Sequence, residues 1–158
     1  MQIRPAIPDD YPCLAEIQRA SVDALLRPLY DGDAIDVWLQ RIKPDKFVRA
    51  VDQGEVILLA EENRRPMGFV SYCSQGELLG MWYVHAQHTD RGVGRALLEA
   101  AEQALREAGC NEAFTEASIY AKPVFQALGW TAIDEYEKPA FGSQFRVTRM
   151  TKSLTETA

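Results

Sequence analysis

The chain has 158 residues, 47% of them hydrophobic and 25% charged, which is typical of a globular domain with one core. Its formal net charge of −6 gives a nucleic-acid partner no electrostatic support. The three cysteines, Cys13, Cys73 and Cys110, have no metal-ligand spacing, and their odd number argues against a disulfide framework. There is no signal-peptide pattern and no apolar run long enough to span a bilayer. We therefore expect a single cytoplasmic domain over residues 1–158 with core thiols, no metal and no membrane partner.

The first half of the chain predicts a strand, then helices, then a hairpin. Residues 3–7 favour a short strand, and Pro8-Asp9-Asp10 offers a start for a helix that continues to Pro28. Asp33 is a candidate cap for a second helix, which Pro44 ends, and residues 47–51 suggest another short helix. Residues 56–60 and 67–73 predict a hairpin, and residues 77–84 predict the next strand.

The second half predicts strands that alternate with helices. A glycine loop after residue 84 opens into an amphipathic helix, which Gly109 ends. A strand over residues 112–117, a short helix over 122–128, and two strands over 130–136 and 144–150 complete the pattern. Because hairpins come first and strand–helix crossovers come later, the predicted fold class is α/β with a mixed sheet.

The loop between residues 84 and 98 is a candidate anion site. A strand that leads through a glycine loop into a helix presents free backbone N–H groups and the positive end of the helix dipole. Arg91 and Arg95 add charge and, four residues apart, can share one face. A lysine-type phosphate loop does not fit because Arg95-Ala96 follows the second glycine, and a dinucleotide fold does not fit because Leu97 replaces the third. A diphosphate site late in a mixed sheet remains, beside the alternative of a turn that needs glycine only for its geometry.

Two segments resemble the signatures of one known family. Residues 89–94, TDRGVG, are similar to the acetyl-CoA signature Gln/Arg-x-x-Gly-x-Gly/Ala of the GCN5-related N-acetyltransferases, the GNAT family. Residues 118–130, SIYAKPVFQALGW, resemble the second signature of that family, Asn-x-x-Ala-…-Phe-Tyr-x-x-x-Gly-Phe. The resemblance implies the GNAT acyl-CoA N-acyltransferase fold, which has a mostly antiparallel central sheet of six to seven strands and about four flanking helices.

The chain departs from these signatures at functional positions. Thr89 and Asp90 stand where the family has Gln or Arg and a small residue. Phe125 stands where the family often has the tyrosine that protonates the leaving thiolate. Because an aspartate beside a diphosphate is electrostatically unfavourable, we expect Asp90 to turn outward or cap the helix while Arg91 and Arg95 face the anion. Since the family holds the diphosphate mainly through backbone N–H groups, these departures need not abolish binding.

The resemblance implies transfer of an acetyl group from acetyl-CoA, as co-substrate, to an amine of a small molecule, peptide or protein. The backbone N–H near Val84 is then expected to polarise the thioester carbonyl. The ammonium must first lose a proton, so Glu116 and His85 are candidate bases, and Tyr120 is a candidate acid. A solvent-facing carboxylate, a solvated loop histidine and a packed tyrosine are the alternatives. The expected contacts to acetyl-CoA are Trp82, Tyr83, Val84, Asp90, Arg91, Gly92, Val93, Gly94, Arg95, Ser118 and Phe125.

The acceptor amine is expected near the early helices, because the acceptor pockets of the family vary between residues 20 and 50 and near residues 136 to 145. Carboxylates and aromatic rings gather there and suit a cationic amine, although caps, turns and a core tryptophan explain the same residues. They are Tyr30, Asp31, Asp33, Asp36 and Trp38. A non-catalytic acyl-CoA-binding or interaction module that keeps the fold is the alternative function. A homodimer through the terminal strands is an expectation from the family alone.

Overall fold

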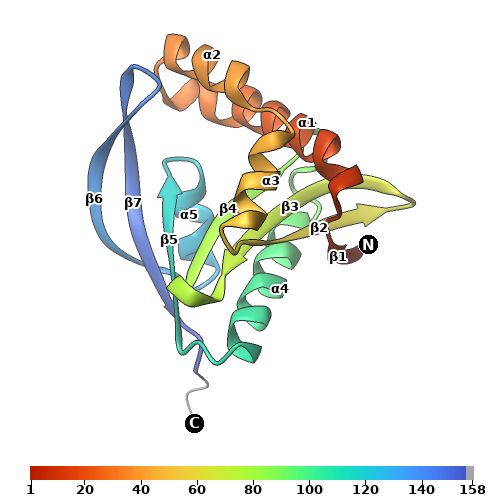
Figure 1. The fold of residues 1–158 in the computed structure, drawn as a ribbon. Helices are drawn as coiled ribbons and strands as arrows, with labels where there is room; N and C mark the ends of the chain where they lie inside the picture. Colours follow the sequence, from red (N-terminus) through yellow and green to blue (C-terminus); the bar gives the residue numbers. More distant parts are fainter. Residues whose placement is uncertain (156–158) are drawn as a thin grey trace.

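The computed structural model describes residues 1–155, which fold around one seven-stranded sheet with helices on both faces (Figure 1). The strand order is β1-β2-β3-β4-β5-β7-β6. β4 and β5 run parallel, and every other pair of neighbours is antiparallel. The strands are β1 (Gln2–Pro5), β2 (Val56–Glu62), β3 (Arg65–Cys73), β4 (Leu78–Val84), β5 (Glu112–Ser118), β6 (Thr131–Ala140) and β7 (Ser143–Ser153).

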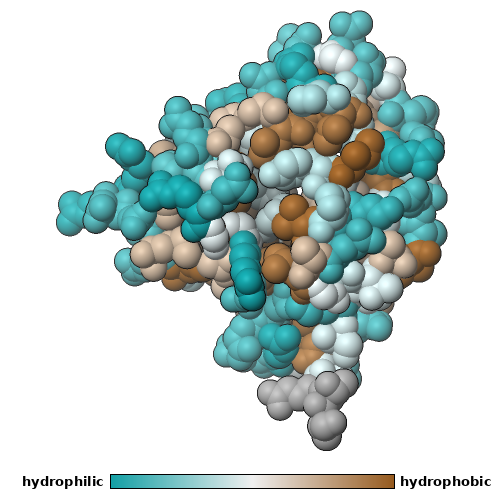
Figure 2. Space-filling view, turned by 180° about the vertical axis from the view of Figure 1, so that it is seen from behind, coloured by the Kyte–Doolittle hydropathy of each residue, from teal (hydrophilic) through white to brown (hydrophobic). Residues whose placement is uncertain are grey.

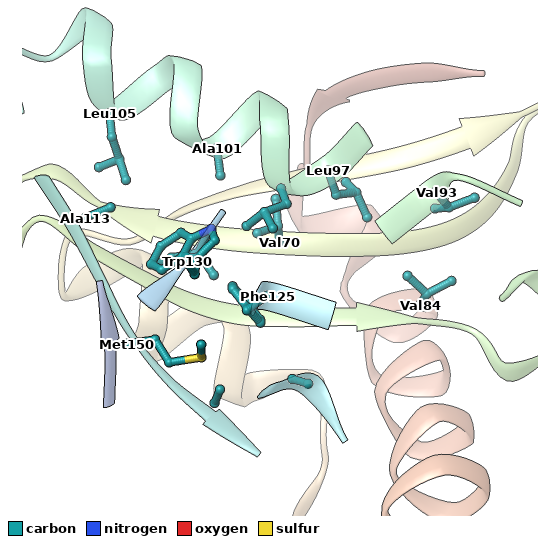
Figure 3. Packing of buried hydrophobic residues seen from close by; sticks show 14 of the residues in the cluster. Val70, Val84, Val93, Leu97, Ala101, Leu105, Ala113, Phe125, Trp130 and Met150 are labelled. Carbon is teal, nitrogen blue, oxygen red and sulfur yellow. The ribbon is translucent and has the colours of Figure 1, made fainter. Parts of the chain in front are cut away.

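The helices divide between the two faces of the sheet, and each face has its own buried cluster. One face carries α1 (Tyr11–Ser21), α2 (Gly32–Arg41) and α3 (Asp45–Asp52), and the other carries α4 (Val93–Glu107) and α5 (Ala121–Ala127). α4 has a buried apolar residue at every fourth position from Val93, and this apolar stripe packs on the sheet (Figure 3). The residues of the stripe are Val93, Leu97, Ala101 and Leu105.

The predicted mixed, mostly antiparallel sheet is confirmed at seven strands. Residues 1–155 contain five α-helices, one more than expected. The strand after α5 is longer than predicted, since β6 runs to Ala140 and pairs with β7 along its length. The extra residues form the tip of a hairpin that lies beside α2 (Figure 1).

Two expectations about the early helices are corrected. The first helix does not continue regularly to Pro28, because α1 ends at Ser21 and a π-helical turn follows over Val22–Leu26. Apolar spacing indicates a helix but does not reveal the one extra residue that a π turn holds. Asp31, and not Asp33, caps α2, since the Asp31 carboxylate accepts the Asp33 N–H at 3.4 Å.

The three cysteines are free thiols, and Cys13 is exposed, which corrects the expectation that all three lie in the core. Among residues 1–155, no three His, Cys, Asp or Glu side chains are grouped so that they could hold a metal ion. Within the same range, no helix has the length and apolar character needed to cross a lipid bilayer.

β4 and β5 separate soon after they meet. Their only Cα pairing joins Leu78 to Phe114, and the Thr115 hydroxyl then donates to the Leu79 carbonyl at 2.9 Å. Beyond Thr115, β5 pairs only with β7. A gap therefore opens in the middle of the sheet between the second half of β4 and the end of β5.

A β-bulge in β4 accompanies this separation, because the register between β3 and β4 shifts next to Ser71. The buried Ser71 hydroxyl accepts the Met81 N–H at 2.7 Å and donates to a Glu55 carboxylate oxygen at 2.8 Å. A Cβ at Gly80 would lie 2.7 Å from both of these oxygen atoms, so the bulge requires glycine there. Bulges bend a strand locally, and this one lies where β4 leaves β5.

Candidate functional site

A cleft of about 690 Å³ occupies the gap between β4 and β5. Its lining includes Val84 and Phe125 from the cluster under α4, and Leu26 and Phe145 from the cluster under α1 and α2. Because both clusters contribute, the cleft passes through the sheet from one face to the other. Figure 2 shows apolar side chains gathered near the middle of one face of the molecule, between hydrophilic margins.

The N-terminus of α4 borders one end of the cleft through Gly92, Gly94 and Arg95. The first N–H of this helix to find an acceptor is that of Ala96, which donates to the Gly92 carbonyl at 3.1 Å. Within residues 1–155, no hydrogen bond involves the N–H groups of residues 92–95 as donors, and no side chain caps the helix. These N–H groups and the helix dipole together form a site that favours an anion.

The two glycines of this loop are needed for different reasons. Gly92 is the N-cap at φ +80°, a left-handed conformation that favours glycine, and a Cβ there would meet nothing within 4 Å. A Cβ at Gly94 would lie 2.7 Å from the Trp82 ring, whose Nε1 donates to the Gly94 carbonyl at 2.9 Å. Gly94 therefore allows close packing of an indole under the first turn of α4, while the space beside Gly92 stays open.

The charged side chains of the loop are arranged differently from the expectation. Arg91 donates to the Glu62 carboxylate at 3.4 Å and lines a second hollow of about 330 Å³. Arg95 lines the main cleft and pairs with Glu99 at 2.9 Å. Arg91 precedes the helix, so the i, i+4 rule does not apply to the two arginines, and they line different hollows. Asp90 does not cap α4, whose N-cap is Gly92, and it is exposed at the rim of the cleft.

The residues of the second signature form the floor of the cleft. The Ser118 hydroxyl accepts the N–H of Ala121, the first residue of α5, at 3.1 Å. Phe125 is 2% exposed, and its ring packs 5.3 Å from that of Trp82 and 5.1 Å from that of Trp130, measured between centroids (Figure 3 shows Phe125 and Trp130). Phe125 thus supplies packing and no hydroxyl at this position.

The second half of β4 presents backbone donors to the gap. The N–H groups of Met81 and His85 point toward β3, because they donate to Ser71 and Met67. Since successive N–H groups along a strand point to opposite sides, those of Trp82 and Val84 face the gap. Tyr83 also lines the cleft, and burial raises the pKa of its hydroxyl to about 12.

The three residues expected to transfer protons lie in different surroundings. Glu116 lines the cleft, but its carboxylate accepts from Lys138 Nζ at 2.6 Å and from the Tyr136 hydroxyl. Partial burial alone raises the pKa of Glu116, yet these two donors outweigh it and leave that pKa below its ordinary value. His85 is absent from the lining, and its Nδ1 accepts the N–H of Gln87 at 3.1 Å.

Tyr120 lines the cleft at the start of α5. Burial first, and then the negative charge of Asp90, raise the pKa of the Tyr120 hydroxyl, so it stays protonated at neutral pH. A protonated hydroxyl at this place has the property that a general acid needs.

His88 is a lining residue that sequence reasoning missed, and it lies between the main cleft and the second hollow. Burial first, and then the charge of Arg91, lower its pKa, so the ring is neutral at pH 7. Arg91 lies 3.2 Å from Nδ1 and can only donate, which leaves the proton of the neutral ring on Nε2. Nothing in the sequence distinguishes His88 from the neighbouring His85, because the difference arises from contacts across the loop.

Of the carboxylates and aromatic residues considered as surroundings for an amine, only the aromatic ones line the cleft. Tyr30 and Trp38 line the far end of the cleft as expected. Asp31 caps α2, Asp36 pairs with Arg27 at 2.8 Å, and neither these two nor Asp33 is among the lining residues. Residues 25–38 and 138–147 both contribute to this end of the cleft, which agrees with the two variable regions expected from the family.

Comparison with known proteins identifies the family. The model of the acetyltransferase (GNAT) domain matches residues 26–154, whereas a search of curated protein sequences finds no match. A GCN5-related N-acetyltransferase from Rhodopseudomonas palustris is 29% identical, with a TM-score of 0.87 over 96% of this chain and 94% of that one. The paia N-acetyltransferase from Thermoplasma acidophilum, solved with coenzyme A, is 20% identical, with a TM-score of 0.80 over 96% and 98%.

A third similar structure is an aminoglycoside 6'-N-acetyltransferase in complex with coenzyme A. It is 13% identical, with a TM-score of 0.73 over 100% of this chain and 99% of that one. At this identity and at that of the Thermoplasma protein, the likeness concerns the fold alone. The family model covers most of the chain, and the fold agrees with it. The chain therefore belongs to the GNAT acetyltransferase family.

Proposed function

We propose that this protein is an N-acetyltransferase that moves the acetyl group of acetyl-CoA to an amine. The observation that carries the proposal is the cleft through the sheet, which has free backbone N–H groups at one end and an apolar pocket at the other. Two ligands entering such a cleft from opposite faces meet where β4 and β5 separate. Membership of the GNAT family and the coenzyme A in two of the similar structures support the same assignment.

The residues at the α4 end fit the diphosphate of coenzyme A. The N–H groups of residues 92–95 supply donors without protein acceptors, and Arg95 supplies positive charge beside them. The exposed Asp90 is the unfavourable neighbour, and its exposure to water weakens the repulsion. The part of coenzyme A between the diphosphate and the thioester would then lie in the gap, along the unpaired edges of β4 and β5.

The chemistry follows from the groups in the gap. The Val84 N–H donates to the thioester oxygen as negative charge develops there. The neutral amine attacks the carbonyl carbon, a C–N bond forms, and the C–S bond breaks. Tyr120 gives its proton to the departing thiolate and regains one from solvent, which also takes up the proton lost by the amine. Glu116 and His85 stay sequence predictions for the base, which the pairing of Glu116 and the position of His85 do not favour.

The first test is release of the coenzyme A thiol from acetyl-CoA with a panel of primary amines, measured beside the melting temperature with coenzyme A. A ligand at 100 times its Kd stabilises the folded state by about 2.7 kcal/mol, so coenzyme A should raise the melting temperature clearly. An unchanged melting temperature would contradict the cofactor assignment. Stabilisation without turnover would instead support the non-catalytic acyl-CoA-binding module, which the absence of a hydroxyl at Phe125 favours.

Tyr120→Phe should lower kcat about tenfold, with little change in the KM for acetyl-CoA. General acids contribute about 10² to 10⁴, and the effect here should be smaller because a thiolate is already a fair leaving group. Steady-state kinetics of the purified variant measure both constants. Phe125→Tyr places a hydroxyl at the position the family uses, so the double variant should recover part of the lost kcat. An unchanged kcat in Tyr120→Phe would remove Tyr120 from the mechanism.

The pH dependence should follow the acceptor amine. The pKa values of Glu116 and His88 lie below their ordinary values, so neither group titrates between pH 7 and 9. The pKa of Tyr120 is raised, so the acid stays protonated over the same interval. We expect kcat/KM for the amine to rise about tenfold per pH unit from 7 to 9, since the reactive neutral amine rises by that factor.

Glu116→Gln and His85→Ala serve as controls for this pH profile. Both should keep the same slope and lose less than about threefold in kcat/KM, since solvent takes the amine proton in the proposed mechanism. A wild-type profile that levels off near pH 6.5 would point to a histidine base instead. Loss of turnover in one variant, with its melting temperature unchanged, would identify that residue as the base.

A further inference from the structure

The far end of the cleft is an apolar pocket, which we call the acceptor chamber. Its lining residues come from the turn after α1, from α2 and from the tip of the β6–β7 hairpin. They are Leu25, Leu26, Tyr30, Trp38, Phe141 and Phe145. We propose that the acceptor chamber selects small primary amines whose body is aromatic or branched and apolar, an inference that rests on the acetyltransferase function proposed above.

The aromatic rings of the chamber form one connected cluster. Trp38 and Phe141 are stacked, with centroids 5.4 Å apart and an angle of 14° between the rings. Phe145 packs edge-on to Trp38 at 5.9 Å and lies 4.9 Å from Tyr30. Rings held in this way offer both faces and edges to another ring. The hydroxyl of Tyr30 is not free for an acceptor, because it donates to Arg146 and accepts from Ile119.

The backbone is irregular at two separate places that serve the chamber. The π-helical turn over Val22–Leu26 supplies two consecutive residues of the lining, Leu25 and Leu26. Phe141 and Gly142 form the two-residue hairpin turn, both with positive φ, at 52° and 77°. Asparagine and glycine favour such a turn, and a bulky aromatic residue there is strained. The ring of Phe141 thus occupies the chamber at a cost to its own turn.

The charges near the chamber disfavour a second ammonium. Glu116 is the carboxylate that lines this end, and it is already paired with Lys138. Lys138 also lines the cleft, and the Arg41 guanidinium lies 5.7 Å from the centroid of the Phe141 ring. A polyamine would therefore bring positive charge toward two cations, and the carboxylate of Glu116 is already paired; the exposed Asp90 lies at the opposite end of the cleft, beside the N-terminus of α4. An apolar body with a single amine meets no such repulsion.

The experiment compares 2-phenylethylamine, hexylamine, propylamine, ethanolamine and spermidine as acceptors for the full-length protein. We expect kcat/KM for 2-phenylethylamine to exceed that for ethanolamine and spermidine by about tenfold or more. From propylamine to hexylamine it should rise by up to about fourfold per methylene. Equal or better turnover of ethanolamine or spermidine would overturn the proposal.

The variant Phe141→Asn distinguishes a loss of amine binding from a loss of stability. Asparagine suits the turn, so the melting temperature should stay level or rise, while kcat/KM for 2-phenylethylamine falls about tenfold and KM for acetyl-CoA stays unchanged. Trp38→Leu should produce a similar loss. Ile133→Asn, at a half-exposed position of β6 outside the lining, is the matched control and should change neither constant. Unchanged kcat/KM for 2-phenylethylamine in Phe141→Asn would overturn the chamber as the specificity element.

Failure of the proposed function leaves the chamber testable by itself. If no amine is acetylated, calorimetric titration of 2-phenylethylamine into the protein with coenzyme A measures binding of the amine directly. Binding that is lost in Phe141→Asn and kept in Ile133→Asn supports the chamber without the chemistry. The absence of binding to the wild-type protein overturns it.

Discussion

Replacing Gly94 with valine should lower kcat/KM for acetyl-CoA by at least about 100-fold, or about 2.7 kcal/mol. A Cβ at this position would lie 2.7 Å from the Trp82 ring, and the indole is held there by its hydrogen bond to the Gly94 carbonyl. The ring must move, or the first turn of α4 must lift away from β4. Either movement displaces the N–H groups that we propose for the diphosphate. Kinetics and titration with coenzyme A measure the loss.

Alanine variants of Gly92 and Gly109 separate the effect of backbone strain from the effect of a side chain in the proposed diphosphate site. Gly92 and Gly109 have similar left-handed conformations, with φ of +80° and +91°, and a Cβ at either would meet nothing within 4 Å. Each substitution by alanine should cost about 1 kcal/mol of stability, because only the backbone is strained. Gly92→Ala should also weaken the binding of coenzyme A, since the methyl group of the new alanine enters the proposed diphosphate site. Equal affinities in the two variants would contradict that site.

The position of the proposed anion site was predictable because its signal is local. Gly92 and Gly94 follow a strand and open a helix, and both properties are visible within one short window of the sequence. The role of each glycine was not predictable. It depends on Trp82, which reaches the first turn of α4 only because β4 packs beneath that helix.

The separation of β4 and β5 was beyond sequence reasoning. It accompanies a bulge in which Ser71 accepts from Met81 and donates to Glu55, three residues that come from different segments of the chain. Hydrophobic periodicity predicts a strand over residues 77–84. It cannot show that the Met81 N–H donates to the Ser71 hydroxyl and not to a backbone carbonyl of the neighbouring strand. The family resemblance implies a site near Val84, and Val84 lies in the part of β4 that borders the gap.

The acceptor end shows which of two interpretations of the early carboxylates holds. The sequence allows Asp31 and Asp36 either to surround an amine or to serve as caps and turn residues, and the structure shows a cap at Asp31 and an ion pair between Asp36 and Arg27. The sequence does not mark Phe141 as a pocket residue, because it lies in a turn, where aromatic residues carry no pattern. Its contact with Trp38 joins segments from opposite ends of the chain, and only the folded sheet brings them together.

Replacing Glu102 with alanine should lower the free energy of unfolding by about 3 kcal/mol, the largest loss of stability expected from one charged residue here. Its carboxylate is 3% exposed, pairs with Lys152 at 2.6 Å and accepts from Trp130 Nε1 at 3.4 Å. The substitution leaves a buried indole N–H and an ammonium without this acceptor. For a chain of this length, the melting temperature should fall by about 6–12 °C.

Glu99→Ala is the matched control, because Glu99 lies on the same helix and its pair with Arg95 is mostly exposed. It should cost less than about 0.5 kcal/mol. Glu102→Gln keeps an acceptor for Trp130 and should lose less than Glu102→Ala. Glu102 links α4 to Lys152 of β7 and to Trp130, whose ring packs against Phe125 of the cleft. It therefore stabilises the floor of the cleft although it is not a lining residue. Below its lowered melting temperature, Glu102→Ala should therefore keep kcat within about threefold, and a larger loss would show that the rigidity of this floor enters catalysis.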